Sequence, residues 1–418
     1  MQTLQTFSKK EQPSVAELVG EILDKQRVEP YFQPLISVKN LSLIGLEALA
    51  RGRTQLGELV PPLVLFEEAA RLGRSIETDR LCRDQALTAF GKVQESYPEL
   101  FLFLNFDATL IDQGVVGSDY LKQSVEKRGL RPRTIVVEIS ESKVQDIGML
   151  KAFIEKYRGY GFLFALDDIG IGHSNLDRLL LTKPDILKID RCLITDIHLD
   201  CYKQEVFSSI VNISKKVGAL VVAEGIETEE EALLCCDLGA DFLQGYYFSK
   251  PQPYHGSLNV FKGVKEATEQ LRRHFKQYKV DKIQAAVNRN QFYKAVAEKM
   301  TLELSETLPE TFDEKLIEAA RYPQLEYVYL LDEKGLQISN SVCDACAVSR
   351  PQKKLFQAAQ KGADQSLKNY YLYVHAGLEQ YISEPYISCA TGSLCITVSR
   401  KFRAADGCCY ILCADFTV

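Results

Sequence analysis

Side chains that bind metal ions and phosphate groups recur along the N-terminal part of the sequence, at the ends of six short apolar runs. They are Glu47 and Arg51, Asn105, Glu138 and Glu141, Asp167 and Asp168, Lys188 and Asp190, and Glu224 and Glu227. Gln244 lies inside a further apolar run. Carboxylates gathered in one place repel each other strongly unless cations neutralise them. Ligands that are all oxygen atoms favour Mg²⁺ or Mn²⁺ over zinc.

The order of these residues carries more information than any one of them. A single Asp or Glu after a strand is usually a helix cap or a solvated strand end. Here six consecutive runs each supply an acid, an amide or a lysine. The adjacent Asp167 and Asp168 would let one carboxylate bridge two cations while the other binds one. Two metal ions about 4 Å apart stabilise both the attacking and the leaving oxygen of an in-line phosphoryl displacement.

The apolar runs themselves predict the elements that position these residues. They are Glu29–Val38, Leu41–Ala50, Leu100–Phe106, Thr134–Ile139, Phe162–Leu166, Asp185–Ile189, Ala219–Ala223 and Asp241–Phe248. Their length and composition are typical of buried strands. Between most of them the apolar spacing changes to three and four, as in helices that cover a sheet. Gly129, Gly161, Gly218 and Gly239 are placed where such helices would end.

Eight strands alternating with helices predict a (β/α)8 barrel, in which the carboxyl ends of the strands meet at one face. The first two runs are separated only by Lys39 and Asn40. So short a turn joins only antiparallel strands, so the first strand is expected to run backwards. A doubly wound open sheet is the alternative, which periodicity does not exclude.

The rest of the chain predicts a helical connector and a small α+β domain. We expect a barrel over residues 14–255, a connector over 256–309 and a C-terminal domain over 310–418. In the connector, Val264–Tyr278 and Gln291–Leu304 have helical spacing, and a pair of ordinary domain helices is the alternative. The predicted C-terminal elements are strands at Glu326–Leu331, Leu336–Ser339, Tyr370–Tyr373, Leu394–Val398 and Cys409–Ala414, and a helix at Lys353–Gln360.

Composition excludes several classes of partner and location. The net charge of −6 argues against a duplex nucleic acid partner, which requires clustered Lys and Arg. The sequence has no run of 18 apolar residues that would predict a membrane span. The polar segment before Ser14 lacks the apolar core of a signal peptide. We therefore expect a cytoplasmic protein whose 12 cysteines are mostly reduced thiols. Cys343 and Cys346 have metal-ligand spacing, but a zinc site needs two more ligands.

The run Glu47-Ala48-Leu49-Ala50-Arg51 resembles the signature of the EAL-domain family, whose members hydrolyse cyclic di-GMP to linear pGpG. Further matching pieces follow in the same order as in that family. They are Tyr31-Phe32-Gln33-Pro34, Asn105, Val137-Glu138-Ile139-Ser140-Glu141, Asp167-Asp168-Ile169-Gly170, Leu187-Lys188-Ile189-Asp190, Ala223-Glu224-Gly225-Ile226-Glu227 and Gln244-Gly245-Tyr246. Each piece is common, but the ordered set is specific and covers about residues 15–253.

The resemblance implies a role for each matching residue. The ligands of a first metal ion would be Glu47, Asn105, Glu138 and Asp167, and those of a second Asp167, Asp168 and Glu224. Lys188 would contact the attacking water, and Glu224 is also cast as the base. The residues that would hold the substrate are Gln33, Leu49, Arg51 and Gln244. Those that would support the site from behind are Glu141, Asp190 and Glu227.

Three departures from the family pattern bear on turnover. Gly52 follows Arg51 where the family has an aromatic residue, and Asp107 stands where Ser is common. The segment Ile169-Gly170-Ile171-Gly172-His173-Ser174-Asn175 differs from the usual Phe-Gly-Thr-Gly-Tyr-Ser-Ser. A cyclic di-GMP phosphodiesterase is the leading interpretation. The alternatives are a cyclic di-GMP receptor that signals by conformational change, and a divalent-metal hydrolase of another phosphoester.

The C-terminal domain resembles PAS-like or Cache-like sensory modules. The resemblance rests on Tyr329-Leu330-Leu331-Asp332-Glu333-Lys334-Gly335, on Tyr381–Tyr386 and on Thr391-Gly392. It implies regulation of the barrel by an unknown small ligand or partner. Connector helices and sensory domains commonly self-associate, and EAL barrels pair in this family, so we expect a homodimer.

Overall fold

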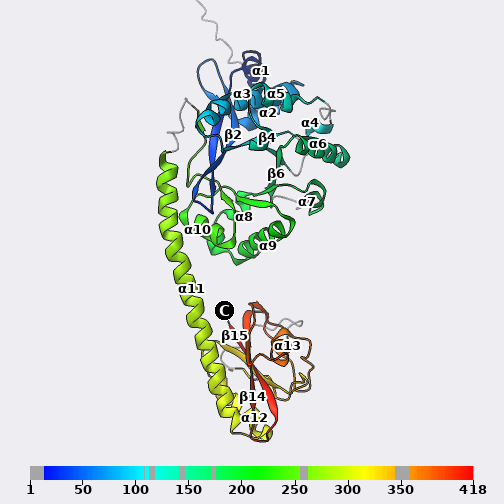
Figure 1. Ribbon diagram of the computed structural model, residues 1–418, viewed down its shortest axis with the longest axis vertical. Coiled ribbons are helices and arrows are strands. Elements are labelled where there is room, and N and C mark those ends of the chain that lie inside the picture. The colour runs from blue at the N-terminus through cyan, green and yellow to red at the C-terminus, as the bar shows by residue number, and fades with distance from the viewer. Residues whose placement is uncertain are drawn as a thin grey trace, which may run out of the picture. The chain divides into compact units, whose positions relative to one another are not determined.

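The computed structural model describes residues 14–107, 109–112, 118–140, 146–170, 176–254, 262–343 and 357–417. The chain divides into two compact units, Met1–Lys279 and Val280–Val418 (Figure 1). No helix within the described ranges is long and apolar enough to cross a bilayer. The described cysteines form no disulfide with one another.

The first unit is a closed barrel. Its strands are β1 (Val28–Ser37), β2 (Ser42–Arg53), β4 (Phe101–Phe106), β5 (Ile135–Ser140), β6 (Leu163–Ile169), β7 (Ile186–Ile189), β8 (Leu220–Ala223) and β9 (Phe242–Leu243). Neighbouring strands from β2 to β9 are parallel, whereas β1 pairs antiparallel with both β2 and β9 and closes the barrel. The short strands β3 (Leu59–Val60) and β10 (Gln252–Pro253) extend it. The predicted barrel with a reversed first strand is confirmed, and the open sheet is excluded.

Helices cover the outside of the barrel (Figure 1). They are α1 (Val15–Asp24), α2 (Pro62–Arg71), α3 (Ser75–Ser96), α4 (Thr109–Asp112), α5 (Tyr120–Lys127), α6 (Ile147–Gly159), α7 (Leu176–Thr182), α8 (Arg191–Ile194), α9 (Cys201–Val217) and α10 (Glu229–Leu238). Ser14 and Glu17 form a capping box at the start of α1, in which each side chain accepts a hydrogen bond from the backbone N–H of the other residue. The four glycines expected at helix ends all have positive φ.

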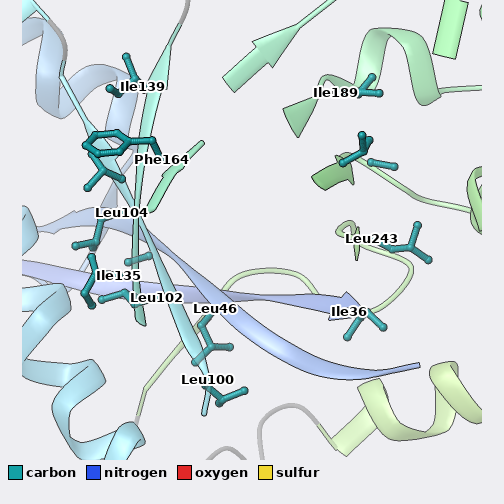
Figure 2. Packing of buried hydrophobic residues seen from close by; sticks show 14 of the residues in the cluster. Ile36, Leu46, Leu100, Leu102, Leu104, Ile135, Ile139, Phe164, Ile189 and Leu243 are labelled. Atoms are coloured by element: carbon teal, nitrogen blue, oxygen red, sulfur yellow. The ribbon is translucent and has the colours of Figure 1, made fainter. Parts of the chain in front are cut away.

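Two apolar layers fix which way each strand faces. Outward-facing side chains such as Leu102, Leu104, Ile135 and Ile139 pack in the shell between strands and helices (Figure 2). A second cluster fills the barrel interior with Leu35, Phe103, Val136, Ala165, Ile186 and Val222. Side chains two residues apart on a strand point to the same face. On each parallel strand, the residue two positions after the interior apolar residue therefore also points inward. It lies one layer closer to the carboxyl end of the barrel.

The second unit is an antiparallel sheet with helices on both faces. Its strands are β11 (Leu325–Leu331), β12 (Gln380–Ile382), β13 (Tyr386–Ile387), β14 (Leu394–Arg403) and β15 (Cys409–Thr417), in the order β11-β15-β14-β12, with β13 beside β14. The helices are α11 (Lys262–Ser305), α12 (Phe312–Ala319) and α13 (Asn369–His375). The C-terminal half of α11 packs Tyr293 and Met300 against one face with Phe416. On the other face α13 packs Tyr370 and Val374.

Three predicted strands differ from the structure. The segment Tyr370–Tyr373 is helical, because Tyr370, Tyr371 and Val374 bury one face of a helix, a spacing that four residues alone do not reveal. The segment Leu336–Ser339 makes only isolated bridges, as Asp332 accepts hydrogen bonds from two backbone N–H groups and bends the chain. The predicted strand Asp241–Phe248 shortens to Phe242–Leu243.

The predicted helical connector is confirmed, and it is continuous. The two predicted helices are parts of one helix, α11, because neither Gly nor Pro occurs between them. Gln357–Gln360, the described part of the predicted helix Lys353–Gln360, is not helical, and the remainder lies outside the described residues.

Candidate active site

The ammonium group of Lys188 lies at the centre of the polar layer. Its Nζ is 2.6 Å from Glu138 Oε1 and 2.6 Å from Glu224 Oε1. It is also 3.6 Å from carboxylate oxygens of Glu47 and Asp167. These five residues come from or directly follow strands β2, β5, β6, β7 and β8. Lys188 is only 1% exposed, so one buried cation faces four carboxylates.

Amide side chains orient Glu47 within this cluster. Asn105 Nδ2 donates to Glu47 Oε1 at 3.0 Å, and Gln244 Nε2 donates to Glu47 Oε2 at 2.5 Å. Gln244 Nε2 also lies 3.3 Å from Gln33 Oε1. Gln33 and Glu47 are register partners across β1 and β2, which explains why their side chains meet. The amides therefore hold the carboxylate of Glu47 from two sides.

The excess of negative charge shifts the pKa values of the whole cluster. Burial alone would lower the pKa of Lys188, but the four carboxylates raise it well above its usual value. Burial raises the pKa of Glu47, but Lys188, Gln244 and Asn105 outweigh it and lower the pKa overall. Burial and then the charge of Glu47 raise the pKa of Glu138 well above normal.

The remaining two carboxylates shift in the same direction as Glu138. Burial raises the pKa of Asp167, and it raises the pKa of Glu224 to about 8, in both cases against the influence of Lys188. At neutral pH the cluster therefore holds protons, because Lys188 alone does not neutralise it.

The donor set fits a hard divalent cation by its chemistry. Asn105 and the four carboxylates offer only oxygen atoms as ligands. Both carboxylate oxygens of Glu138 are buried, and while Oε1 contacts the ammonium group of Lys188, Oε2 accepts no hydrogen bond from the described residues. Within the described ranges, no three acidic, histidine or cysteine side chains already surround a common point as metal ligands would. The carboxylates instead surround Nζ of Lys188.

A distortion at the end of β6 places Asp168 next to Asp167. The β6–β7 register shifts between Leu166 and Ile169, and Asp168 has a φ of 61°. The backbone N–H of Asp168 donates to Asp167 Oδ1 at 2.9 Å. A left-handed residue other than glycine costs about 1–3 kcal/mol and persists only where the surrounding structure enforces it. The charge of Asp168 adds to the raised pKa of Asp167, so the two carboxylates are close enough to interact.

Two glycines bring the ends of the last strands together. A Cβ at Gly245 would lie 2.0 Å from the carbonyl oxygen of Ile226. That approach allows Ile226 N–H to donate to Gln244 O at 3.1 Å, which fixes Gln244 beside the loop that follows Glu224. Gly225 has a φ of 68°, and a Cβ there would lie 2.3 Å from Cβ of Arg191. Any larger residue at either position would displace this loop.

Glu231 holds the same loop and was not singled out from the sequence. Its buried carboxylate accepts hydrogen bonds from the backbone N–H groups of Asp196, Glu227 and Thr228 at 2.9, 2.8 and 3.1 Å. Thr228 and Glu231 form a capping box, whose Thr-x-x-Glu spacing is the signal that identifies it.

Leu49 lines a cavity of about 360 Å³ together with Asn105 and Asp107. Arg51 is half-buried on the same strand, and its guanidinium lies 5.6 Å from the centre of the Tyr31 ring. The alternation along β2 thus puts Glu47, Leu49 and Arg51 on one face.

A buried ion pair that sequence analysis missed lines the same cavity. Arg83 Nη2 lies 2.6 Å from Asp79 Oδ2, and both side chains are buried. Burial raises the pKa of Asp79 to about 6. The i, i+4 spacing of the two residues on α3 is a signal, but one that surface pairs share.

The residues expected to support the site do not belong to the carboxylate cluster around Lys188. Asp190 caps α8 by accepting a hydrogen bond from Cys192 N–H at 2.7 Å. Glu227 lies on the surface, 3.7 Å from Arg191. Glu141, Ile171 and His173 lie outside the described residues.

The chain is similar to proteins of cyclic di-GMP signalling. Residues 16–251 match the EAL domain. The "Uncharacterized EAL-domain containing protein YkuI" of Bacillus subtilis is 29% identical over 326 residues, which are 75% of this chain and 77% of YkuI. The cyclic di-GMP phosphodiesterase RocR of Pseudomonas aeruginosa is 29% identical over 268 residues. That alignment covers 60% of this chain and 64% of RocR.

Two solved structures show the same fold. The crystal structure of YkuI in complex with cyclic di-GMP and calcium matches 97% of this chain and 100% of its own, with a TM-score of 0.78 and 26% identity. The manganese and cyclic di-GMP complex of Klebsiella pneumoniae BlrP1 matches 54% of this chain and 56% of its own, with a TM-score of 0.50 and 28% identity. The YkuI match includes both the barrel and the C-terminal α+β unit. Since the EAL domain spans more than half of its length, this chain belongs to the EAL-domain family.

Proposed function

We propose that this protein is a cyclic di-GMP-specific phosphodiesterase that forms linear pGpG with two divalent cations, Mg²⁺ or Mn²⁺. The observation that carries the proposal is the buried cluster of four carboxylates around Lys188. Its negative charge exceeds what one lysine neutralises, so it favours cations of high charge. RocR, a relative of this chain, is named a cyclic di-GMP phosphodiesterase.

The described residues suggest how the two cations would be shared. Glu47, Asn105, Glu138 and Asp167 would hold one of them, and Asp167, Asp168 and Glu224 the other. When bound, such ions lower the pKa of water and stabilise the negative charge that develops on the leaving oxygen. In the cluster without bound cations Lys188 is protonated, because the four carboxylates raise its pKa. We assign to it the orientation of the attacking water.

Glu224 is also proposed as the group that accepts the proton of the water, through a carboxylate oxygen that does not bind the second cation. Without bound cations burial raises its pKa to about 8, and a cation bound beside it would lower that pKa, so that it would be an ionised base at neutral pH. Its contact of 2.6 Å with Lys188 keeps it beside the group that orients the water. Asp190 and Glu227 would act indirectly, through α8 and its contact with the loop after β8.

Substrate contacts are assigned to the rim of the cluster. Arg51 presents a planar fork of donors that suits a phosphate group. Leu49 lines the cavity in which a guanine base would lie. Gln33 and Gln244 would contact the nucleotide, and Gln244 Oε1 is buried without a hydrogen bond from the described residues.

A catalytically weak cyclic di-GMP receptor is the second candidate. The observation that favours it is the altered segment after Asp168, in which Ile171 and His173 depart from the family pattern. The presence of Gly52 in place of the usual aromatic residue does not favour the receptor. A Cβ at that position would lie 3.2 Å from Val60 and 3.3 Å from Ile22, so glycine there follows from packing on the outer side of β2.

We also infer that the protein is a homodimer and that its C-terminal unit regulates the barrel. Val280, Ile283 and Val287 form an exposed apolar stripe on α11 with spacings of three and four. Such a stripe is typical of a helix that packs against a second helix.

The first prediction concerns metal dependence. Cleavage should require Mg²⁺ or Mn²⁺, stop in excess chelator, and be inhibited by Ca²⁺, which tolerates irregular coordination. Mn²⁺ affinity should rise with pH through about 8, because Glu224 and Glu138 must lose their protons to become ligands. Calorimetric titration of Mn²⁺ across this pH range measures the effect. Full activity in excess chelator, or an affinity that falls with pH, would contradict the proposal.

The second prediction concerns the residues of the cluster. Glu47→Ala and Asp167→Ala should abolish turnover, because each removes a charged oxygen ligand. Lys188→Ala should reduce kcat by a factor of about 100 to 10,000 while cyclic di-GMP affinity changes little. Lys216→Ala, an exposed lysine of α9, is the matched control.

Product chromatography and cyclic di-GMP titration give the two quantities, and thermal unfolding checks that each variant is folded. Equal losses of turnover and affinity for Lys188→Ala would argue against its role on the water.

The third prediction concerns the oligomer. Light scattering at micromolar concentration should give about twice the chain mass of 47.1 kDa. Ile283→Glu should produce monomers by placing charge in the apolar stripe, whereas Ile317→Glu, at an exposed position on α12, should not. A monomeric wild-type chain would be inconsistent with the inferred dimer.

The fourth prediction concerns coupling between the units. A chain ending at Lys279 should be compared with the full chain, because Val264 and Leu271 of α11 belong to the barrel core. We expect its cleavage rate to change by a factor of about 5 to 100, with cyclic di-GMP affinity within about twofold. Unchanged cleavage, or a parallel loss of affinity, would show that the C-terminal unit does not regulate catalysis in this way.

A further inference from the structure

The C-terminal unit contains a second cavity, of about 510 Å³. It lies on the sheet face that α13 covers, and its wall includes Tyr329 of β11, Asp415 of β15, Tyr370 of α13 and Tyr386 of β13. Its size falls within the range of small-molecule sites. All of its described lining residues belong to the second unit, and none of them belongs to the carboxylate cluster of the barrel.

Asp415 is the one acidic side chain that is buried in the described wall of this cavity. It is 5% exposed, and its Oδ1 accepts a hydrogen bond from Thr397 Oγ1 at 2.6 Å. Thr397 Oγ1 in turn lies 2.5 Å from the hydroxyl of Tyr386. Strand register explains the arrangement, since Asp415 pairs with Thr397 on one side and with Tyr327 on the other.

No described lysine, arginine or histidine forms an ion pair with Asp415. Burial raises the pKa of Asp415 to about 7, and the nearby charge of Glu326 acts in the same direction. Glu326 is itself buried, and its Oε2 accepts no hydrogen bond from the described residues. A carboxylate without a counter-ion is unfavourable inside a sheet, where an apolar residue of similar size packs more stably. The missing positive charge must therefore come from outside the described chain or from a proton.

The rest of the wall favours an organic cation as the source of that charge. Five tyrosines line the cavity, namely Tyr327, Tyr329, Tyr370, Tyr381 and Tyr386. Aromatic faces attract ammonium groups, most strongly where water is excluded. Burial raises the pKa of Tyr329 and Tyr386, so their hydroxyls stay protonated and their rings stay neutral.

Anions and metal ions suit the described wall less well. Among the described lining residues Lys368 is the one cation, and it is exposed at the rim, so a buried anion would find no positive charge among them. A metal ion needs several converging ligands, and within the described ranges no three acidic, histidine or cysteine side chains converge.

We propose that this cavity binds a small organic cation, a primary amine or a quaternary ammonium compound, with Asp415 as its counter-ion. The cation would lie against the tyrosine rings, with its charge towards the carboxylate. Ser383, Ser388 and Gln365, which also line the cavity, would bind polar groups elsewhere on the molecule. The inference names a ligand class for the C-terminal unit, and it stands whether or not the barrel cleaves cyclic di-GMP.

Calorimetric titration of the full chain with defined probes tests the proposal. The amine probes are choline and 1,4-diaminobutane, the uncharged analogue of choline is 3,3-dimethyl-1-butanol, and acetate and Mg²⁺ represent anions and metal ions. We expect saturable binding of at least one amine, with no comparable binding of the neutral analogue or of acetate. The same binding should persist in Lys188→Ala, which alters only the barrel site.

Asp415→Asn keeps the shape of the side chain and removes its charge. We expect this variant to bind the amine at least about tenfold more weakly. Its thermal unfolding temperature should be unchanged or higher, because it loses a buried charge, and this separates a lost site from a lost fold. Glu384→Gln removes the same charge from an exposed position at the rim and should leave affinity within about twofold.

Four results would overturn the proposal. The first is that neither amine binds at concentrations up to about 10 mM, and the second is that the neutral analogue binds as tightly as the amine. The third is an unchanged affinity in a folded Asp415→Asn variant, and the fourth is displacement of the amine by Mg²⁺ at the same site.

Discussion

The contact of one buried lysine with four carboxylates is the interaction on which the rest of the barrel depends. Lys188 is almost completely enclosed, and each carboxylate reaches it from a different strand or strand end. Groups of like charge stay this close only where rigid elements hold them and a cation lies between them. The closed barrel provides such elements, because each strand is fixed by a neighbour on either side. The apolar cluster that fills the barrel interior, which includes Phe103, Val136 and Ile186, determines which residues face inward.

The loops at this end of the barrel serve the same cluster. The distortion at Asp168 keeps two adjacent carboxylates within interaction distance. Gly225 and Gly245 allow backbones to approach where a side chain would separate them. Glu231 accepts hydrogen bonds from three backbone N–H groups, two of them in the loop that follows Glu224, and so fixes the shape of that loop. Each feature costs conformational freedom or backbone strain, and each helps to fix a charged group near Lys188.

Sequence reasoning predicted the barrel, its reversed first strand and the acidic face, because alternation and turn length are local signals. It did not predict that Lys188 is the point on which the acids converge, since that depends on distances between strands. The buried pair of Asp79 and Arg83 was missed because an i, i+4 pair on a helix is usually exposed. In the C-terminal unit the sequence of Tyr370–Tyr373 predicts a strand, but this segment is part of the helix α13. Asp415 gave no signal, because its environment is set by strands and a helix that are distant in sequence.

The most direct test of this account is hydrolysis of cyclic di-GMP by the full chain in water enriched in oxygen-18, with Mg²⁺ present. Mass spectrometry of the product measures where the new oxygen goes. If the carboxylate cluster and Lys188 direct a water molecule onto one phosphodiester, the product is linear pGpG with one oxygen-18 atom in its terminal phosphate. Bound but intact cyclic di-GMP, or a product without the label, would contradict the account.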